Sequence, residues 1–305
     1  MDPNPIGGTD YIRLGVSDLS FTQTFTDTPY SNRTLHNNTN FFEQSNIKKA
    51  NPATFEFTLN LVEEANYTKV LERLLDLTAD NKPETFTLWF VDSRHNSLNF
   101  YITDCVFTSG TFVIEKLAPL ALTLTGEGSK LQEIHNTQAY SLKLSAGDDL
   151  DNVTYQSTKK LEIIVDGTDI SQGVVATTIE LQNEIKWQEY QTVNDALNVT
   201  DESNTMYPSN FTLEKRTLAG SITRFISSSS GSMYEDPDVD TWQTNKSISI
   251  KAGNSLTKGV QLELSNCTFT NRVNPGAIYT SSYDWRMNDN PSNLGSIIKF
   301  NNLTS

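Results

Sequence analysis

Residues 51–61 read NPATFEFTLNL. From Phe55 to Leu61, large apolar residues alternate with polar ones, which is the pattern of a β-strand with one buried and one solvated face. The polar positions are Glu56, Thr58 and Asn60. The stretch therefore predicts a strand at the surface of a mainly β core.

An amphipathic helix is predicted directly after this strand, over residues 65–77. Its apolar residues recur at the spacing i, i+3, i+4, i+7, i+8, which places them on one helix face. They are Tyr67, Val70, Leu71, Leu74 and Leu75. Further apolar runs predict strands at 86–91, 98–107, 112–117 and 120–125. Several long antiparallel strands with one helix packed on a face indicate an α+β, mainly β, sandwich or barrel.

The same succession of short motifs occurs twice along the chain. Residues 19–23, 51–57 and 102–108 resemble, in order, residues 185–189, 207–213 and 264–270. The shifts of 166, 156 and 162 positions are nearly constant. We interpret them as one unit duplicated in tandem, with chance similarity among strands as the alternative.

The duplication predicts two domains, over residues 1–150 and 158–305, joined near residues 146–158. In the second domain we expect strands at 177–188, 211–226, 247–251, 260–269 and 278–287. Its helix signal is lost, and a Ser-rich and acidic stretch at 227–238 stands in that place. Such a stretch cannot bury enough apolar surface to pack and predicts a loop.

The chain of 305 residues is strongly acidic, with 23 Lys and Arg against 37 Asp and Glu and a formal net charge of −14. Residues 1–155 carry a net charge of −9 and residues 156–305 a net charge of −5. This argues against a conventional nucleic-acid binder, which needs a basic surface. We find neither a run of about 20 apolar residues that would cross a membrane nor a signal peptide at the N-terminus.

No catalytic or metal-binding motif is present. The three histidines, His36, His95 and His135, are far apart in polar stretches, and neither a zinc signature nor a phosphate-binding glycine loop occurs. Cys105 and Cys267 each stand two residues before a Phe, which predicts small core residues rather than a disulfide. We expect no enzyme, cofactor or metal.

Other charged and aromatic residues allow weaker interpretations. The acidic clusters at 148–151 and 236–240 lack the Gly and Glu of a calcium loop and are read as solvated loops. Arg216 and Arg224 are read as the solvent face of a strand. Surface Trp residues could stack on sugars in a carbohydrate-binding module, and the candidates are Trp187, Trp242 and Trp285.

The layout of strand pair, polar arm, strand, single helix and long paired strands, ending at residues 120–128 (LALTLTGEG), resembles the tail tube proteins of long-tailed bacteriophages. The tandem copy resembles tube proteins in which two tube domains are fused. The resemblance covers about residues 9–135 and 174–290. It implies a structural virion protein, assembled in the host cytoplasm into the viral tail.

The resemblance also implies an architecture. Three chains would form a pseudo-hexameric ring, the sheets would close around a lumen, and the rings would stack into a tube through which genomic DNA passes without specific binding. Further implied partners are the tape measure protein and adjacent tail, baseplate and terminator proteins. An acidic lumen would repel phosphates and let DNA slide.

Two sets of residues are candidates for these contacts. The polar strand faces are expected to line the lumen, through Glu56, Thr58, Asn60, Thr85 and Thr87. The arm at residues 34–51 is expected to contact the next ring, through His36, Asn38, Phe41, Phe42 and Ile47. A tube-initiating or distal tail and baseplate ring protein is the main alternative function, and a β-rich carbohydrate-binding adhesin module is a further one.

Overall fold

The computed structural model describes residues 14–30, 44–62, 66–91, 99–134, 154–188, 206–226, 245–276, 278–289, 294–295 and 297–300. The chain is mainly β with very little helix, as predicted. The first half contains β1 (Ser17–Thr22), β2 (Phe25–Tyr30), β3 (Gln44–Ala50), β4 (Ala53–Asn60), α1 (Asn66–Leu75), β5 (Phe86–Val91), β6 (Asn99–Glu115), β7 (Ala121–Gly128) and β8 (Lys130–Ile134). The second half contains β9 (Lys160–Val165), β10 (Thr168–Asp169), β11 (Val174–Gln188), β12 (Asn210–Phe225), β13 (Lys246–Ser255), β14 (Lys258–Asn274), β15 (Thr280–Met287) and β16 (Ile298–Phe300).

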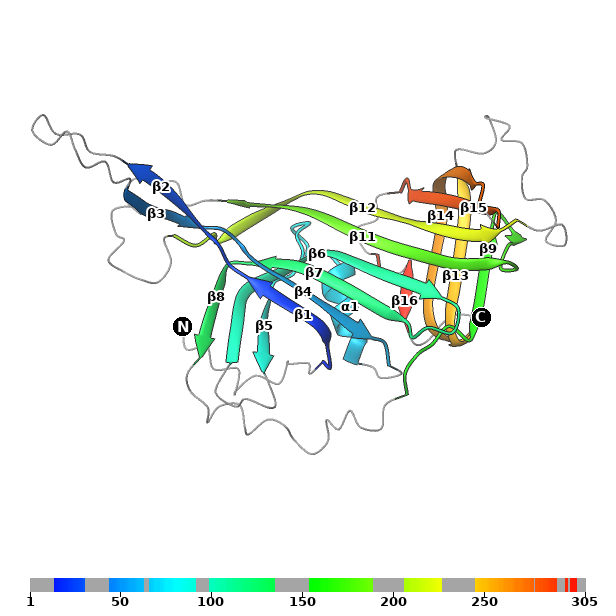
Figure 1. Ribbon diagram of the computed structural model, residues 1–305, viewed down its shortest axis with the longest axis horizontal. Coiled ribbons are helices and arrows are strands. Elements are labelled where there is room, and N and C mark those ends of the chain that lie inside the picture. Colours follow the sequence, from blue (N-terminus) through cyan, green and yellow to red (C-terminus); the bar gives the residue numbers. More distant parts are fainter. Residues whose placement is uncertain are drawn as a thin grey trace, which may run out of the picture.

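One large antiparallel sheet runs through both halves of the chain (Figure 1). Within the described residues it has 14 strands, in the order β1-β4-β7-β6-β11-β12-β15-β14-β13-β9-β10. Strands β5 and β8 pair with β6, and β16 pairs with β14. The strand order β1-β4-β7-β6 is thus followed by β11-β12-β15-β14, with side strands attached to β6 in the first half and to β14 in the second.

Strands β6 and β14 each belong to two layers. The first part of β6 pairs with β5 and β8, and its second part pairs with β7 and β11. The sequence predicted two strands here, at 98–107 and 112–117. The structure has one 17-residue strand instead, because a bulge between Phe107 and Ser109 lets it bend without ending.

The core of the first half lies between these two layers and under the helix. Ala53, Phe55, Phe57 and Leu59 of β4 are buried, as their alternation predicted. Phe55 lies edge-on to Phe86 of the other layer, with ring centroids 6.2 Å apart. The buried residues of α1 on this side are Val70, Leu71, Leu74 and Leu75, which confirms the predicted apolar stripe apart from Tyr67, whose side chain lies outside the described residues.

The helix approaches the sheet closely at one glycine. A Cβ atom at Gly110 of β6 would lie 2.4 Å from the Leu74 Cδ2 atom, so a larger residue would push the helix away. Strands β6 and β7 cross the view in front of α1 in Figure 1. The helix therefore covers the inner face of this sheet, and its opposite face is left uncovered by it.

The segment between the two halves is bonded to both of them. Gln156 is fully buried, its N–H donates to the Leu61 carbonyl, and its own carbonyl accepts from the N–H of Leu120. From the second half, the Asn254 amide donates to the Tyr155 carbonyl at 3.0 Å and accepts from the Ser157 N–H. The predicted linker at 146–158 is described only from residue 154 onward.

Strands β2 and β3 form a separate two-stranded ribbon that projects beyond the main sheet (Figure 1). The sequence predicted a long loop or arm here, and the ribbon gives part of it strand structure. Its base is fixed by Gln23, whose side-chain amide donates to the carbonyls of Asn51 and Ser129, each at 2.9 Å. The N–H of Ala50 also donates to the Met206 carbonyl, at 2.9 Å.

Candidate functional site: a polar sheet face and two sheet edges

The outer face of the main sheet is rich in threonine and serine. Cross-strand partners point to the same side of a sheet, so the registers define this face. Glu56 pairs with Ser20 and Thr125, and Thr58 pairs with Thr123. The hydroxyls of Thr58 and Thr123 are 3.2 Å apart, and those of Ser109 and Thr125 are 2.5 Å apart. These hydroxyls bond one another across the strands and form a polar part of this face.

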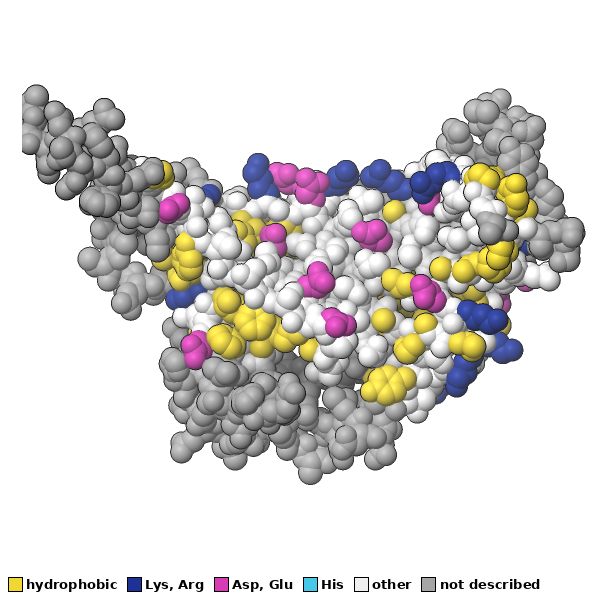
Figure 2. Space-filling view, in the orientation of Figure 1, with side chains coloured by type: hydrophobic (Ala, Val, Ile, Leu, Met, Phe, Trp, Pro, Cys, Tyr) yellow, Lys and Arg dark blue, Asp and Glu magenta, His cyan; other side chains and the backbone are white. Residues whose placement is uncertain are grey.

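The charges on this polar face are mostly negative. The registers place on it Glu56, Glu115, Glu127, Glu180, Glu184 and Asp284, against Lys186, Lys215, Arg272 and Arg286. The four cations all belong to the second half of the chain, and Arg272 forms an ion pair with Asp284. In Figure 2, Asp and Glu side chains are scattered over this face, including its upper edge, and most of the Lys and Arg side chains lie along the upper edge and at the lower right.

Glu127 is a half-buried acid of the polar face. Burial raises the pKa of its carboxyl group, and the hydrogen bond from the Trp187 indole partly offsets this by lowering the pKa. The Trp187 Nε1–H donates to Glu127 Oε2 at 2.7 Å. Trp187 also packs against Phe211, with ring centroids 5.3 Å apart. This contact links β7 of the first half to β11 and β12 of the second.

The residues expected to line a lumen do not all lie on one surface. Glu56 and Asn60 are exposed and Thr58 is half-buried, all three on the polar face. Thr85 and Thr87 belong to the β5 region, in the other layer. Because Phe86 packs inward against Phe107, with ring centroids 4.6 Å apart, the exposed Thr87 points away from the sandwich on the opposite side. The assignment of any of them to a lumen stays a prediction.

The residues expected in the arm are mostly outside the described part of the chain. His36, Asn38, Phe41 and Phe42 lie outside the described residues, as do all three histidines. Ile47 lies on β3, where its backbone pairs with Asp27 of β2. Contact between this ribbon and another ring stays a prediction.

The layer that carries the polar face, β1-β4-β7-β6-β11-β12-β15-β14, ends in two strand segments that each pair on one side only among the described residues. Strand β1 pairs with β4 alone. The second part of β14, from Thr268 to Asn274, pairs with β15 alone. The corresponding part of β6 pairs with β7 on one side and β11 on the other. Apolar side chains are exposed near both edges, among them Leu19 at 40% and Val273 at 39%.

Arg216 of β12 joins the two halves beneath the polar face. Its Nη2 donates to the carbonyls of Leu74 and Leu75 at the end of α1, at 3.2 and 2.7 Å. Its Nε donates to Asn183 Oδ1 at 2.9 Å, and the Asn183 amide donates to the Phe107 carbonyl at 3.0 Å. Burial lowers the pKa of Arg216 to about 10, so the guanidinium stays charged at neutral pH.

The prediction that Arg216 and Arg224 lie on the solvent face of a strand was therefore wrong. Arg224 is 5% exposed, and its Nε donates to the Gln172 carbonyl at 2.7 Å. Both guanidinium groups donate hydrogen bonds to backbone carbonyls of residues outside the strands. In the sequence, the alternation of β12 places Arg216 and Arg224 at inward positions, and this was the available signal that they are not solvent-facing.

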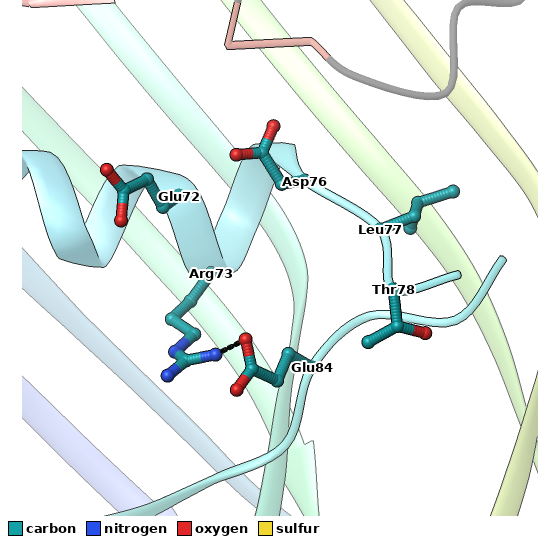
Figure 3. Close-up of a pocket in the computed structure, with 6 residues that line it drawn as sticks. All are labelled: Glu72, Arg73, Asp76, Leu77, Thr78 and Glu84. Atoms are coloured by element: carbon teal, nitrogen blue, oxygen red, sulfur yellow. Dashed lines mark ion pairs between the residues drawn. The ribbon is translucent and has the colours of Figure 1, made fainter. Parts of the chain in front are cut away.

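The described residues contain no grouping that suggests catalysis. A pocket beside the end of α1 is lined by polar side chains, with an ion pair between Arg73 and Glu84 (Figure 3). Its other lining residues are Glu72, Asp76, Leu77 and Thr78. The part of the chain that is described also holds no cluster of three or more His, Cys, Asp or Glu residues that could bind a metal ion. None of its helices is long and apolar enough to cross a membrane.

The cysteines and one tryptophan are core residues. Cys105 and Cys267 are free and fully buried, as predicted, and burial raises the pKa of both thiols, that of Cys267 to about 12. Trp285 is 2% exposed, so the prediction that it could stack on sugars was wrong. Trp187 is half-buried and bonded to Glu127, and Trp242 lies outside the described residues.

The comparisons with known proteins point to one family. No curated protein matches the chain significantly. The model of the Bacteriophage Baseplate Tube Protein Family matches residues 8–305, which is nearly the whole chain. Members of a phage baseplate tube family are components of the virion tail or baseplate, in agreement with the resemblance drawn from the sequence. With this match across both halves of its continuous sheet, the chain belongs to the bacteriophage baseplate tube protein family.

Proposed function

We propose that three copies of this chain close into a pseudo-hexameric ring that forms part of the tube conducting phage DNA. Each chain contributes two tandem copies of one tube unit, and rings stack along the tube axis. The tape measure protein and adjacent tail, baseplate and terminator proteins are the expected partners. Membership of a baseplate tube family favours a baseplate position, and the repeated major subunit of the tail tube is the second candidate.

The single observation that carries this proposal is the repeated strand order. The order β1-β4-β7-β6 is followed by β11-β12-β15-β14 in one sheet, and the two sets join side by side through β6 and β11. The first two motifs that match in sequence are paired with each other in both halves, since Phe21 pairs with Phe55 and Trp187 pairs with Phe211. A sheet that already joins two units can add further units in the same way until it closes.

Closure would also resolve the two sheet edges. An unpaired edge is a site of uncontrolled association, and barrels remove edges altogether. In the layer that carries the polar face, each chain has one such edge at β1 and one at β14, so a head-to-tail arrangement leaves neither of these two exposed. A head-to-tail contact gives a ring when its rotation closes and a filament when it does not.

The polar face is the proposed lining of the channel. Its acids repel the phosphates of DNA, and its hydroxyls already bond one another across strands, as Thr58 and Thr123 do. DNA near such a wall meets repulsion over about 8–10 Å at physiological salt. The helix α1 on the inner side of the sheet leaves this face free for that role.

Electron cryomicroscopy of virions tests the proposal. We expect rings of three chains, with Glu56 and Glu180 facing the channel. A ring with these two residues on its outer wall would overturn the lumen assignment. Copy number in the virion separates the two candidates, because a baseplate component forms one or a few rings and a tail tube subunit forms many.

A further inference from the structure

Leu117 occupies a position that is unfavourable for a leucine in two ways. It lies in the turn between β6 and β7, where its side chain is 72% exposed and its φ of 60° falls in the left-handed region. Glycine and asparagine adopt this conformation more readily than other residues, and both suit a turn in water. Residues that keep such a backbone conformation in spite of its cost cluster at functional sites. The side chain of Leu117 therefore points to a contact surface at this turn.

Leu117 belongs to a surface made of three chain segments that hydrogen bonds hold together. The segments, which we call the turn platform, are residues 116–119, 154–159 and 253–258. The Thr158 N–H donates to the Ala118 carbonyl at 3.1 Å, and the Lys159 N–H donates to the Gly253 carbonyl at 3.1 Å. The turn platform thus joins the end of β6, the segment between the two halves and the turn between β13 and β14.

Each segment of the turn platform has an exposed apolar side chain. Leu117 is 72% exposed, Tyr155 is 56% exposed and Leu256 is 38% exposed. Single exposed apolar residues are normal on protein surfaces, whereas a group of them indicates an interaction site. Because the three segments are bonded to one another, these side chains belong to one surface.

The turn platform is also cationic. Its residues include Lys116, Lys159 and Lys258 and neither Asp nor Glu, and Lys160 follows directly at the start of β9. All four lysines are exposed, in a chain whose net charge is −14. Figure 2 shows Lys and Arg side chains beside hydrophobic ones at the lower right, which is this end of the molecule. DNA would match the lysines alone, so the apolar side chains favour an acidic protein segment.

The turn platform lies at the end of the main sheet opposite to the ribbon of β2 and β3 (Figure 1). Strand β6 ends beside it at Glu115, which pairs with Ala176 near the start of β11. Strand β11 ends at Gln188, at the ribbon end, where Met206 is bonded to Ala50. A closed sheet has the ends of its strands at its two rims. In the proposed ring, the turn platform and the ribbon therefore face opposite ways along the axis.

Residues 189–205 connect Gln188 to Met206 and thus begin and end at the ribbon end of the sheet. The segment contains no Lys or Arg, and its acidic residues are Glu189, Asp195, Asp201 and Glu202. Its larger apolar residues are Tyr190, Val193, Leu197 and Val199. This composition is complementary to that of the turn platform. Head-to-tail stacking brings the ribbon end of one ring against the turn platforms of the next.

We propose that the turn platform binds the acidic segment 189–205 of a second copy in the adjacent ring. The exposed lysines pair with its acids, and Leu117, Tyr155 and Leu256 cover its apolar side chains. This inference rests on the proposed stacking of rings and names the surface and the chemistry of that contact. It also gives the stack a direction, because each ring presents its turn platforms to the ribbon side of its neighbour.

Peptide binding tests this contact without requiring rings. A fluorescently labelled peptide of residues 189–205 is titrated with the purified full-length chain, and fluorescence anisotropy reports binding. We expect saturable binding at low salt that weakens as NaCl is added, because salt screens exposed charges. A peptide whose four acids are replaced by the corresponding amides should bind at least about tenfold more weakly.

The charge of the turn platform is tested by the triple variant Lys116→Glu, Lys159→Glu and Lys160→Glu. Its affinity for the peptide should fall at least about tenfold, since an exposed ion pair contributes roughly a factor of two to three and three pairs are lost. The matched control reverses the same number of exposed lysines elsewhere, namely Lys82→Glu, Lys186→Glu and Lys215→Glu. This control should bind the peptide as the wild type does.

The variant Leu117→Asn tests the apolar part of the contact separately from folding. Asparagine adopts the left-handed conformation more readily than leucine and is compatible with exposure, so the melting temperature should stay the same or rise. The affinity for the peptide should fall about fivefold or more, because the leucine surface is no longer available for burial. Weaker binding at an unchanged melting temperature distinguishes a lost contact from a damaged fold.

The outcomes separate this inference from the proposed function. Stacked rings formed by the triple variant, with no peptide binding by the wild type, overturn the contact and leave the ring intact. Peptide binding by a chain that forms no rings supports the contact and overturns the ring. Neither binding nor rings overturns both.

Three further results would each assign the turn platform differently and overturn this inference. Peptide binding that appears only after Asp148, Asp149 and Asp151 are replaced by Asn would show that the chain's own linker occupies it. An equal loss of affinity in the control triple variant would reduce the effect to net charge. Binding of a DNA duplex through Lys116, Lys159 and Lys160, without binding of the peptide, would make the surface a nucleic-acid site.

Discussion

Replacing Arg216 by methionine removes the cation that joins the second half of the chain to the end of α1. The last carbonyls of a helix have no partner within the helix, and the helix dipole favours a positive charge there. In Arg216→Met, the carbonyls of Leu74 and Leu75 and the Asn183 side chain lose their donor. Methionine keeps much of the length of the side chain, so the change tests the hydrogen bonds rather than a cavity.

The structure sets the size of the effect. Hydrogen bonds from charged donors contribute about 1.5–3 kcal/mol each, and Arg216 makes three of them. Its Nη1 is buried without a partner among the described residues, and desolvation of the cation offsets part of the gain. We expect the free energy of unfolding to fall by about 2–3 kcal/mol. At about 2–4 °C per kcal/mol, the melting temperature should fall by roughly 5–10 °C.

Thermal unfolding and amide hydrogen exchange measure this. The matched control is Lys215→Met, the neighbouring exposed residue on the polar face, which should change stability by no more than about 0.5 kcal/mol. In Arg216→Met the amides of α1 should also exchange faster than in the control. Equal melting temperatures for the two variants, with unchanged protection of α1, would refute the reasoning.

Three further changes have definite expected outcomes. Gly220→Val should lower the free energy of unfolding, measured in urea, by about 3 kcal/mol or more. The reason is that a Cβ atom at this position would lie 2.1 Å from the Thr178 carbonyl oxygen and 2.4 Å from Trp285 Cζ2. An effect no larger than that of the control Ala219→Val would contradict this. The pKa of the Glu127 carboxyl group is raised in the folded state. The wild type should therefore lose stability relative to Glu127→Gln as the pH rises through that pKa. A stability difference between the two proteins that does not change with pH would count against this prediction. Cys105 and Cys267 should react with a thiol reagent only after unfolding, and stoichiometric labelling of native protein would sink the assignment.

Much of the fold follows from alternation and helical spacing. The buried positions of β4 and the stripe on α1 were predicted because each pattern belongs to a single element with one apolar face. The ends of β12 and β15 were close to the predicted ranges for the same reason. Alternation did not predict β6 as one strand, because the bulge at Thr108 reverses the pattern where the strand crosses from one layer to the other.

The candidate site was less accessible from the sequence. Alternation separates the two faces of a strand but does not tell which layer the strand joins, so Thr87 was grouped with Glu56 although they lie on opposite sides of the sandwich. Charge was read as solvent exposure at Arg216 and Arg224. The carbonyls they satisfy come from residues 52 or more positions away, which no local pattern records.

The measurement that tests the central claim most directly is the mass and symmetry of the purified wild-type assembly. Electron microscopy and mass photometry on the same sample give both. The account predicts closed rings with a mass three times the chain mass of 34.1 kDa and pseudo-six-fold symmetry around an open channel. A monomer that persists at high concentration, together with the absence of such rings from virions, would contradict it.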